Sequence, residues 1–186
     1  MRFDSCIPNR KIMKTVDKYL FQALDNYPYW LEGTIESLDY ALSYDDKNTM
    51  ALCLYGQVFA DQLLKYEEAK EYFQKALSIN IYALEVYPFY IHTLILNEDY
   101  EEAMKLIDFA LTVKGMNKTE ILLKKIILLE RQQEFKKALK MIKKVKLTII
   151  NTCYDYTIEE SEKRLNKKLN GDSKKDKPAK KKKKNK

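Results

Sequence analysis

The stretch TMALCLYGQVFADQLLKYEEAKEYFQKALSIN, residues 49–80, decides the fold, because its pattern returns along the chain. Its second half begins with the letters YEEA at Tyr66. The same letters begin 34 residues later at Tyr100, and FKKA begins 35 residues after that at Phe135. A weaker copy, LEGT, begins 35 residues before the first one at Leu31. A fixed period of this length predicts a repeat architecture.

Three columns of residues keep this period. The first column holds small residues, the second holds large apolar residues four positions later, and the third holds small or medium residues three positions after those. Small residues let helix backbones approach closely, and large ones fill the gaps between successive helix pairs. An ordinary antiparallel bundle also has helical spacing, but it does not predict the fixed period. The columns are Thr34, Ala69, Ala103 and Ala138; Leu38, Phe73, Ile107 and Ile142; and Ala41, Ala76, Ala110 and Val145.

These residues resemble the tetratricopeptide repeat (TPR) family, whose pattern is W-x2-L-G-x2-Y…A-x3-F…P. The chain departs from this pattern in three ways: one extra residue separates the two helices of the unit at 49–80, Ile91 replaces the glycine of the next unit, and the closing proline is absent from every unit. The resemblance covers about residues 12–152. The unit at 49–80 matches best, with Leu52, Tyr55, Gly56 and Phe59 on its first helix and Tyr66, Ala69, Phe73 and Ala76 on its second.

The resemblance implies an all-α, right-handed TPR-like α-solenoid of about four helix-turn-helix pairs, with a C-terminal capping helix and a disordered tail. The expected parts are an N-terminal segment at 1–11, repeats within 12–152 (about 15–48, 49–83, 84–118 and 119–152), the capping helix at 153–169 and the tail at 170–186.

Four local signals refine these boundaries. Pro28 suits the first turn of a helix, and Pro88 predicts that another helix begins near Tyr87. Lys114-Gly115 is a helix stop, because glycine tolerates the left-handed conformation. Thr157–Glu160 has the pattern of a capping box that opens the final helix.

The charge of +7 is concentrated in the tail. Residues 171–186 hold nine lysines and two aspartates, while the rest of the chain holds 25 basic and 25 acidic residues. We therefore expect a neutral folded body and a solvated, disordered end. Three readings of the tail stay open: an aid to solubility, contact with nucleic acid or the ribosome, and contact with an acidic protein or a membrane surface. Any nucleic-acid binding would be blind to sequence and sensitive to salt. The lysines concerned are Lys174, Lys175, Lys177, Lys180, Lys181, Lys182, Lys183, Lys184 and Lys186.

The resemblance also implies a peptide-binding groove on the concave face. One branch of the family clamps the C-terminal carboxylates of chaperones with Lys, Asn, Asn, Lys and Arg. Here the matching positions hold Tyr19, Ala23, Leu54, Glu85 and Phe89, so we do not expect chaperone-tail binding. The expected groove is mainly apolar and aromatic, although some of its members could belong to the core between repeats. Its predicted residues are Cys53, Leu54, Gln57, Phe89, His92, Leu96, Leu123, Lys124 and Ile127.

Catalytic and metal-binding signals are weak. The single histidine, His92, excludes a multi-histidine metal cluster, and the four glycines form no phosphate-binding motif. A cysteine and a histidine can form a nucleophile pair. Cys53 and His92 are better explained as a cysteine that lines the groove and a polar side chain. Glu67-Glu68 and Glu101-Glu102 open helices, where they complement the helix dipole. We expect a protein that is not an enzyme and uses no catalytic residues, metal or cofactor.

Three separate cysteines, an N-terminus without a signal-like apolar run and the lack of a long apolar stretch predict a cytoplasmic protein. In a eukaryote the tail could also act as a nuclear localisation signal. The predicted function is a protein–protein interaction scaffold that binds a peptide or helix in its groove. The alternative is an adaptor that associates with nucleic acid or the ribosome through its tail. The sequence does not identify the partner or the oligomeric state.

Overall fold

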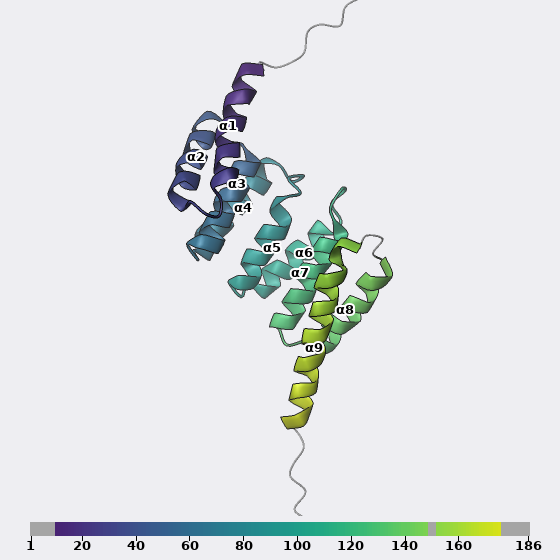
Figure 1. Cartoon of the computed structure of the whole chain (residues 1–186). Helices are drawn as coiled ribbons and strands as arrows, with labels where there is room; N and C mark the ends of the chain where they lie inside the picture. Colours follow the sequence, from purple (N-terminus) through teal and green to yellow (C-terminus); the bar gives the residue numbers. More distant parts are fainter. Residues whose placement is uncertain (1–9, 149–151, 176–186) are drawn as a thin grey trace, which may run out of the picture. The chain divides into compact units, whose positions relative to one another are not determined.

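The computed structural model describes residues 10–148 and 152–175, and every regular element in these residues is helical (Figure 1). This confirms the all-α prediction. The elements are α1 (Arg10–Asn26), α2 (Leu31–Tyr44), α3 (Thr49–Gln57), a π-helical turn (Val58–Gln62), α4 (Tyr66–Ile79), α5 (Val86–Leu96), α6 (Tyr100–Ala110), α7 (Lys118–Arg131), α8 (Phe135–Thr148), a short 3-10 turn (Thr152–Tyr154) and α9 (Asp155–Lys175).

Consecutive helices pack as pairs: α1 with α2, α3 with α4, α5 with α6 and α7 with α8. We call the first helix of each pair the A helix and the second the B helix. The chain divides into two compact units. Unit 1, Met1–Met116, holds the first three pairs, and unit 2, Asn117–Lys186, holds the fourth pair together with α9, which packs on α8.

The three sequence columns are buried on the B helices. All twelve residues have 0% of their surface exposed. Thr34, the odd member of the small column, is accommodated because its hydroxyl donates a hydrogen bond of 2.8 Å to the Trp30 carbonyl. The period in the sequence therefore marks the positions at which helices pack against one another.

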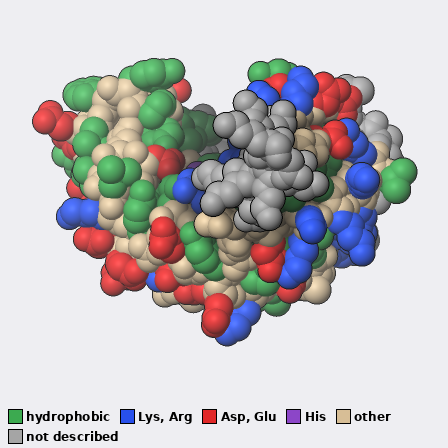
Figure 2. All heavy atoms as spheres, turned by 90° about the horizontal axis from the view of Figure 1, so that it is seen from below, with side chains coloured by type: hydrophobic (Ala, Val, Ile, Leu, Met, Phe, Trp, Pro, Cys, Tyr) green, Lys and Arg blue, Asp and Glu red, His purple; other side chains and the backbone are tan. Residues whose placement is uncertain are grey.

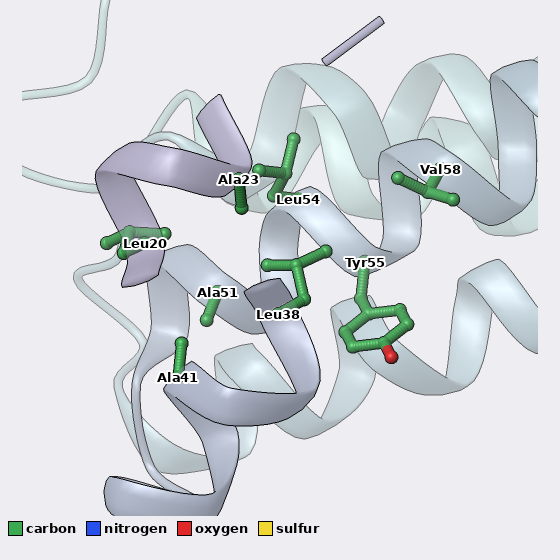
Figure 3. Packing of buried hydrophobic residues seen from close by; sticks show 8 residues of the cluster. All are labelled: Leu20, Ala23, Leu38, Ala41, Ala51, Leu54, Tyr55 and Val58. Atoms are coloured by element: carbon green, nitrogen blue, oxygen red, sulfur yellow. The ribbon is translucent and has the colours of Figure 1, made fainter. Parts of the chain in front are cut away.

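The core of the first two pairs shows how these columns meet the A helices (Figure 3). Small side chains such as Ala23, Ala41 and Ala51 let three helices approach, and Leu38 fills the space among them. In unit 2, a separate core joins α7, α8 and α9. Its buried members are Ile126, Leu129, Ala138, Ile142, Val145, Ile158 and Leu165.

The turn inside each of three pairs contains a residue in the left-handed region: Leu64, Glu98 and Gln133, with φ of 55°, 64° and 61°. Each lies two residues before its B helix. In the later two pairs, the amide after this residue donates to the carbonyl five residues earlier, as from Asp99 to Leu94. In the α3–α4 pair the amide of Lys65 donates to a carbonyl six residues earlier. The extra residue of this pair is therefore absorbed as the π-helical turn.

Three local predictions are corrected. Pro28 lies in the turn before α2, which begins only at Leu31. Gly115 does adopt a positive φ, 88°, but α6 ends earlier, at Ala110. The final helix begins before the proposed capping box, so Thr157 lies inside α9.

Two predictions concern the end of the chain and the proline of α5. Helix α9 continues to Lys175, six residues beyond the expected end of the capping helix, so the first six residues of the expected disordered tail are helical. Residues 176–186 lie outside the described residues. Pro88 falls in the first turn of α5, as predicted, because that helix begins at Val86.

Candidate functional site

The A helices of unit 1 lie next to one another, because α3 contacts both α1 and α5. Side chains at equivalent positions of these helices therefore form a row. Gln57 directly follows Gly56, and His92 follows Ile91 at the equivalent position of α5. Six of the predicted groove residues are on α3 and α5 in unit 1, and the remaining three are on α7 in unit 2.

Two of the six, Cys53 and Leu54, are buried, with 2% of the surface of each exposed. Leu54 belongs to the core shared with Leu20 and Ala23 (Figure 3). The Cys53 thiol donates to the Glu85 carbonyl at 3.9 Å. These two side chains are core residues rather than groove residues, so we leave them out of the candidate site.

The other four predicted side chains of unit 1 reach the surface. Gln57, His92 and Leu96 are half-buried, and Phe89 is 39% exposed. Phe89, His92 and Leu96 follow one another at intervals of three and four residues, so they share one side of α5.

The sequence reading missed two exposed apolar residues on α1. Phe21 is 60% exposed and Leu24 is 39% exposed. Both lie on the first A helix, which contacts α3. The weak repeat in the first pair concealed these two positions. We define the A-helix face of unit 1 as Phe21, Leu24, Gln57, Phe89, His92 and Leu96.

In unit 2, Leu123, Lys124 and Ile127 are all half-buried, and Leu123 packs against the core. Ile127 also lines a shallow pocket of about 450 Å³. The pocket is rimmed by three cations, although the expected groove had few charges. Its other lining residues are Glu130, Arg131, Arg164 and Lys168.

An ion-pair cluster holds one wall of this pocket together. Glu130, only 9% exposed, accepts two hydrogen bonds of 2.8 Å from the Arg164 guanidinium and one of 2.8 Å from Lys168. The bonds from Arg164 are the main reason that the pKa of Glu130 lies below its usual range. The cluster ties α9 to α7, because Glu130 lies on α7 and both cations lie on α9.

The candidate nucleophile has the wrong electrostatics for catalysis. Burial raises the pKa of the Cys53 thiol to about 12, so the thiol stays protonated near neutral pH. Within the described residues, there is no group of three or more His, Cys, Asp or Glu side chains suited to a metal ion. Over the same residues, no helix combines the length and apolar composition needed to cross a membrane.

Comparison with known proteins addresses the fold. One solved structure, YrrB, described as "a TPR protein with an unusual peptide-binding site", is similar to this chain with a TM-score of 0.58 and 20% identity. The similarity covers 86% of this chain and 89% of that chain. The chain has a TPR-like fold. No family model and no curated protein matches the sequence. TPR folds are typically used for binding rather than catalysis, because stacked repeats present extended surfaces.

Proposed function

We propose that this TPR-like protein is an interaction scaffold that binds a peptide or helix on the A-helix face of unit 1. The observation that carries the proposal is the exposure of Phe21, Leu24 and Phe89 on A helices that flank α3. Burial of exposed apolar surface is the main favourable term in association, at about 25 cal/mol per Å². A ligand with apolar side chains would therefore gain free energy by covering this face.

The face favours an apolar or amphipathic ligand over a strongly charged one. Its six members include four apolar side chains, together with the amide of Gln57 and the imidazole of His92. Two polar groups among apolar neighbours suit a ligand that combines hydrogen-bonding groups with aliphatic or aromatic anchors. The binding site described for YrrB is a property of that protein, and it supports only the general use of such folds.

The predicted residues of unit 2 belong to the same proposal as a separate surface. Leu123, Lys124 and Ile127 lie on α7, and the pocket beside Ile127 contains three cations and one carboxylate. A ligand segment bound there would combine an aliphatic side chain with an acidic group, because the positive charge of Arg131 and the apolar side chain of Ile127 line the same pocket.

A displayed peptide library selected against the folded full-length chain tests the proposal. We expect enrichment of peptides with two or more large apolar residues, and we expect soluble copies of these peptides to compete with one another. Enrichment of only lysine-rich or only acidic peptides would contradict an apolar face on unit 1.

The tail-based alternative, an adaptor for nucleic acid or the ribosome, stays a second proposal. Its lysines from Lys177 onward lie outside the described residues. The observation that favours it is the concentration of nine lysines within residues 171–186, which suits contact with phosphate.

A further inference from the structure

The neutral body predicted from the sequence consists of two strongly charged parts of opposite sign. Residues 1–116, unit 1, contain 11 basic and 18 acidic residues, a net charge of −7. Residues 117–170, the rest of the body, contain 14 basic and 7 acidic residues, a net charge of +7. The charges cancel in the total, so composition alone hides a basic folded unit.

Helix α8 presents much of this positive charge on one side. Its sequence, FKKALKMIKKVKLT, contains no acidic residue. At about 100° per residue, five exposed lysines fall within an arc of about 120°, while Ala138, Ile142 and Val145 on the other side are fully buried. Figure 2 shows blue side chains gathered on the side where α8 lies in Figure 1. We call the five the α8 lysine stripe: Lys136, Lys137, Lys140, Lys143 and Lys144.

The stripe is largely uncompensated. Lys137 pairs with Glu134 at 2.6 Å, but this pair is exposed to solvent and therefore weak. Among the described residues, no carboxylate lies within ion-pair distance of Lys136, Lys140 or Lys143. Lys146, which pairs with Glu162, lies outside the arc. Ion pairing among the described residues thus leaves the charges of Lys136, Lys140 and Lys143 available to a partner.

We propose that the α8 lysine stripe binds the phosphate backbone of a double-stranded nucleic acid. From Lys136 to Lys144 the helix rises about 12 Å, a length over which one strand of a duplex has roughly three or four phosphates. Lysine ammonium groups on flexible stems neutralise phosphates as point charges without a fixed geometry. The binding is therefore insensitive to base sequence and sensitive to salt.

The chemistry of α8 distinguishes a duplex from other polyanions. An interfacial membrane helix inserts an apolar face into lipid, but the apolar face of α8 is buried in the core of unit 2. Binding of single strands uses aromatic side chains that stack on bases. The one aromatic residue of α8, Phe135, packs against that core instead. A row of cations without stacking or inserting groups matches the regular charge of a duplex backbone.

Unit 1 differs from unit 2 in the sign of its charge. Its net charge of −7 repels phosphate, so we do not expect unit 1 to add to duplex binding. The stripe and the A-helix face lie in different units, so either proposed binding surface can be disproved without the other.

Titration of the full-length chain against labelled RNA and DNA duplexes at several salt concentrations tests the stripe. The variant Lys136→Gln/Lys140→Gln/Lys143→Gln removes three charges and keeps good helix formers. Its matched control, Lys75→Gln/Lys105→Gln/Lys114→Gln, removes three exposed lysines from unit 1. A third variant, with Lys180 to Lys184 changed to Gln, removes charge from the tail.

We expect the stripe variant to weaken duplex binding about tenfold or more. It should also lower the slope of log K against log salt by roughly 2 to 3, because each neutralised phosphate contributes about 0.9. The control should leave the slope unchanged. Equal losses in the stripe and control variants would overturn the proposal. So would binding that depends on the tail alone, or binding to anionic vesicles without binding to either duplex.

Discussion

Gly56 on α3 lies so close to Phe73 on α4 that a Cβ atom on the glycine would come within 2.5 Å of the phenyl ring. Phe73 is fully buried and stacks on Tyr90 of the next pair, with ring centroids 5.6 Å apart. The ring has no solvent-filled space to enter. The absence of a side chain at Gly56 therefore sets the distance between these two helices.

We predict that Gly56→Ala destabilises the protein by about 1–3 kcal/mol through overpacking. Helix propensity alone predicts the opposite sign, because alanine in a helix interior is favoured over glycine by roughly 0.5–1 kcal/mol. Chemical denaturation of wild type and Gly56→Ala shows whether the substitution lowers or raises the free energy of unfolding. The matched control is Ser78→Ala, an exposed change on α4 with a small expected effect. A stabilised Gly56→Ala variant would show that α3 and α4 are not in close contact at this point.

The left-handed turn residues give a second prediction. Glu98 has a φ of 64° and an exposed side chain. Holding a residue other than glycine in this region costs of order 1 kcal/mol or more. We expect Glu98→Gly to raise the free energy of unfolding by up to about 1 kcal/mol. Glu101→Gly, three residues later inside α6, should lower it by about 1 kcal/mol. Thermal unfolding measures both changes, and the same sign for the two variants would contradict the assigned turn.

The Glu130 cluster gives a third prediction, for unit 2. Replacing the carboxylate by an amide in Glu130→Gln weakens the hydrogen bonds from Arg164 and Lys168, so we expect a loss of about 1–3 kcal/mol. Glu134→Gln removes an exposed pair with Lys137 and should change stability by about 1 kcal/mol or less. Amide hydrogen exchange along α9 measures the local effect. Unchanged protection of α9 in Glu130→Gln would show that the cluster does not hold this helix.

The same cluster predicts a pH dependence. The folded-state pKa of Glu130 is lowered, so its stabilisation is complete above the unfolded-state value of about 4.3. It is lost as the pH falls through the lower folded-state pKa. Between pH 7 and pH 3, wild type should therefore lose more stability than Glu130→Gln. Equal losses of stability in the two proteins over this pH range would contradict a lowered pKa of Glu130.

The fold was predictable because its signal is repeated. Ala69, Ala103 and Ala138 recur at a spacing that only packing between successive helices requires, and all three are buried. The turn geometry was not predictable, since Leu64, Glu98 and Gln133 adopt positive φ angles without being glycine or asparagine. The residue types at these positions do not indicate the backbone hydrogen bonds that close the turns, such as the bond from the Asp99 amide to the Leu94 carbonyl.

The candidate site was predictable only in part. One step along a helix turns a side chain by about 100°. A small error in the position assigned within the repeat is therefore enough to place the buried Cys53 and Leu54 in the predicted groove. In the first pair, the weak repeat hid Phe21 and Leu24 altogether. The basic surface of α8 was missed for a different reason, because the negative charge of unit 1 cancels it in any count over the whole body.

We have proposed that the A-helix face of unit 1 binds an apolar peptide. The most direct measurement is the affinity of a library-selected peptide for three proteins: wild type, Phe21→Ala/Phe89→Ala and Tyr82→Ala. Tyr82, 66% exposed in the turn before α5, is the control for the loss of an exposed aromatic side chain. We predict that the double variant, with unchanged helical circular dichroism, binds at least about tenfold more weakly, since each ring removed costs roughly 1 kcal/mol or more at a contact centre. Tyr82→Ala should bind as wild type does. Equal affinity of the folded double variant and wild type would contradict peptide binding at the A-helix face.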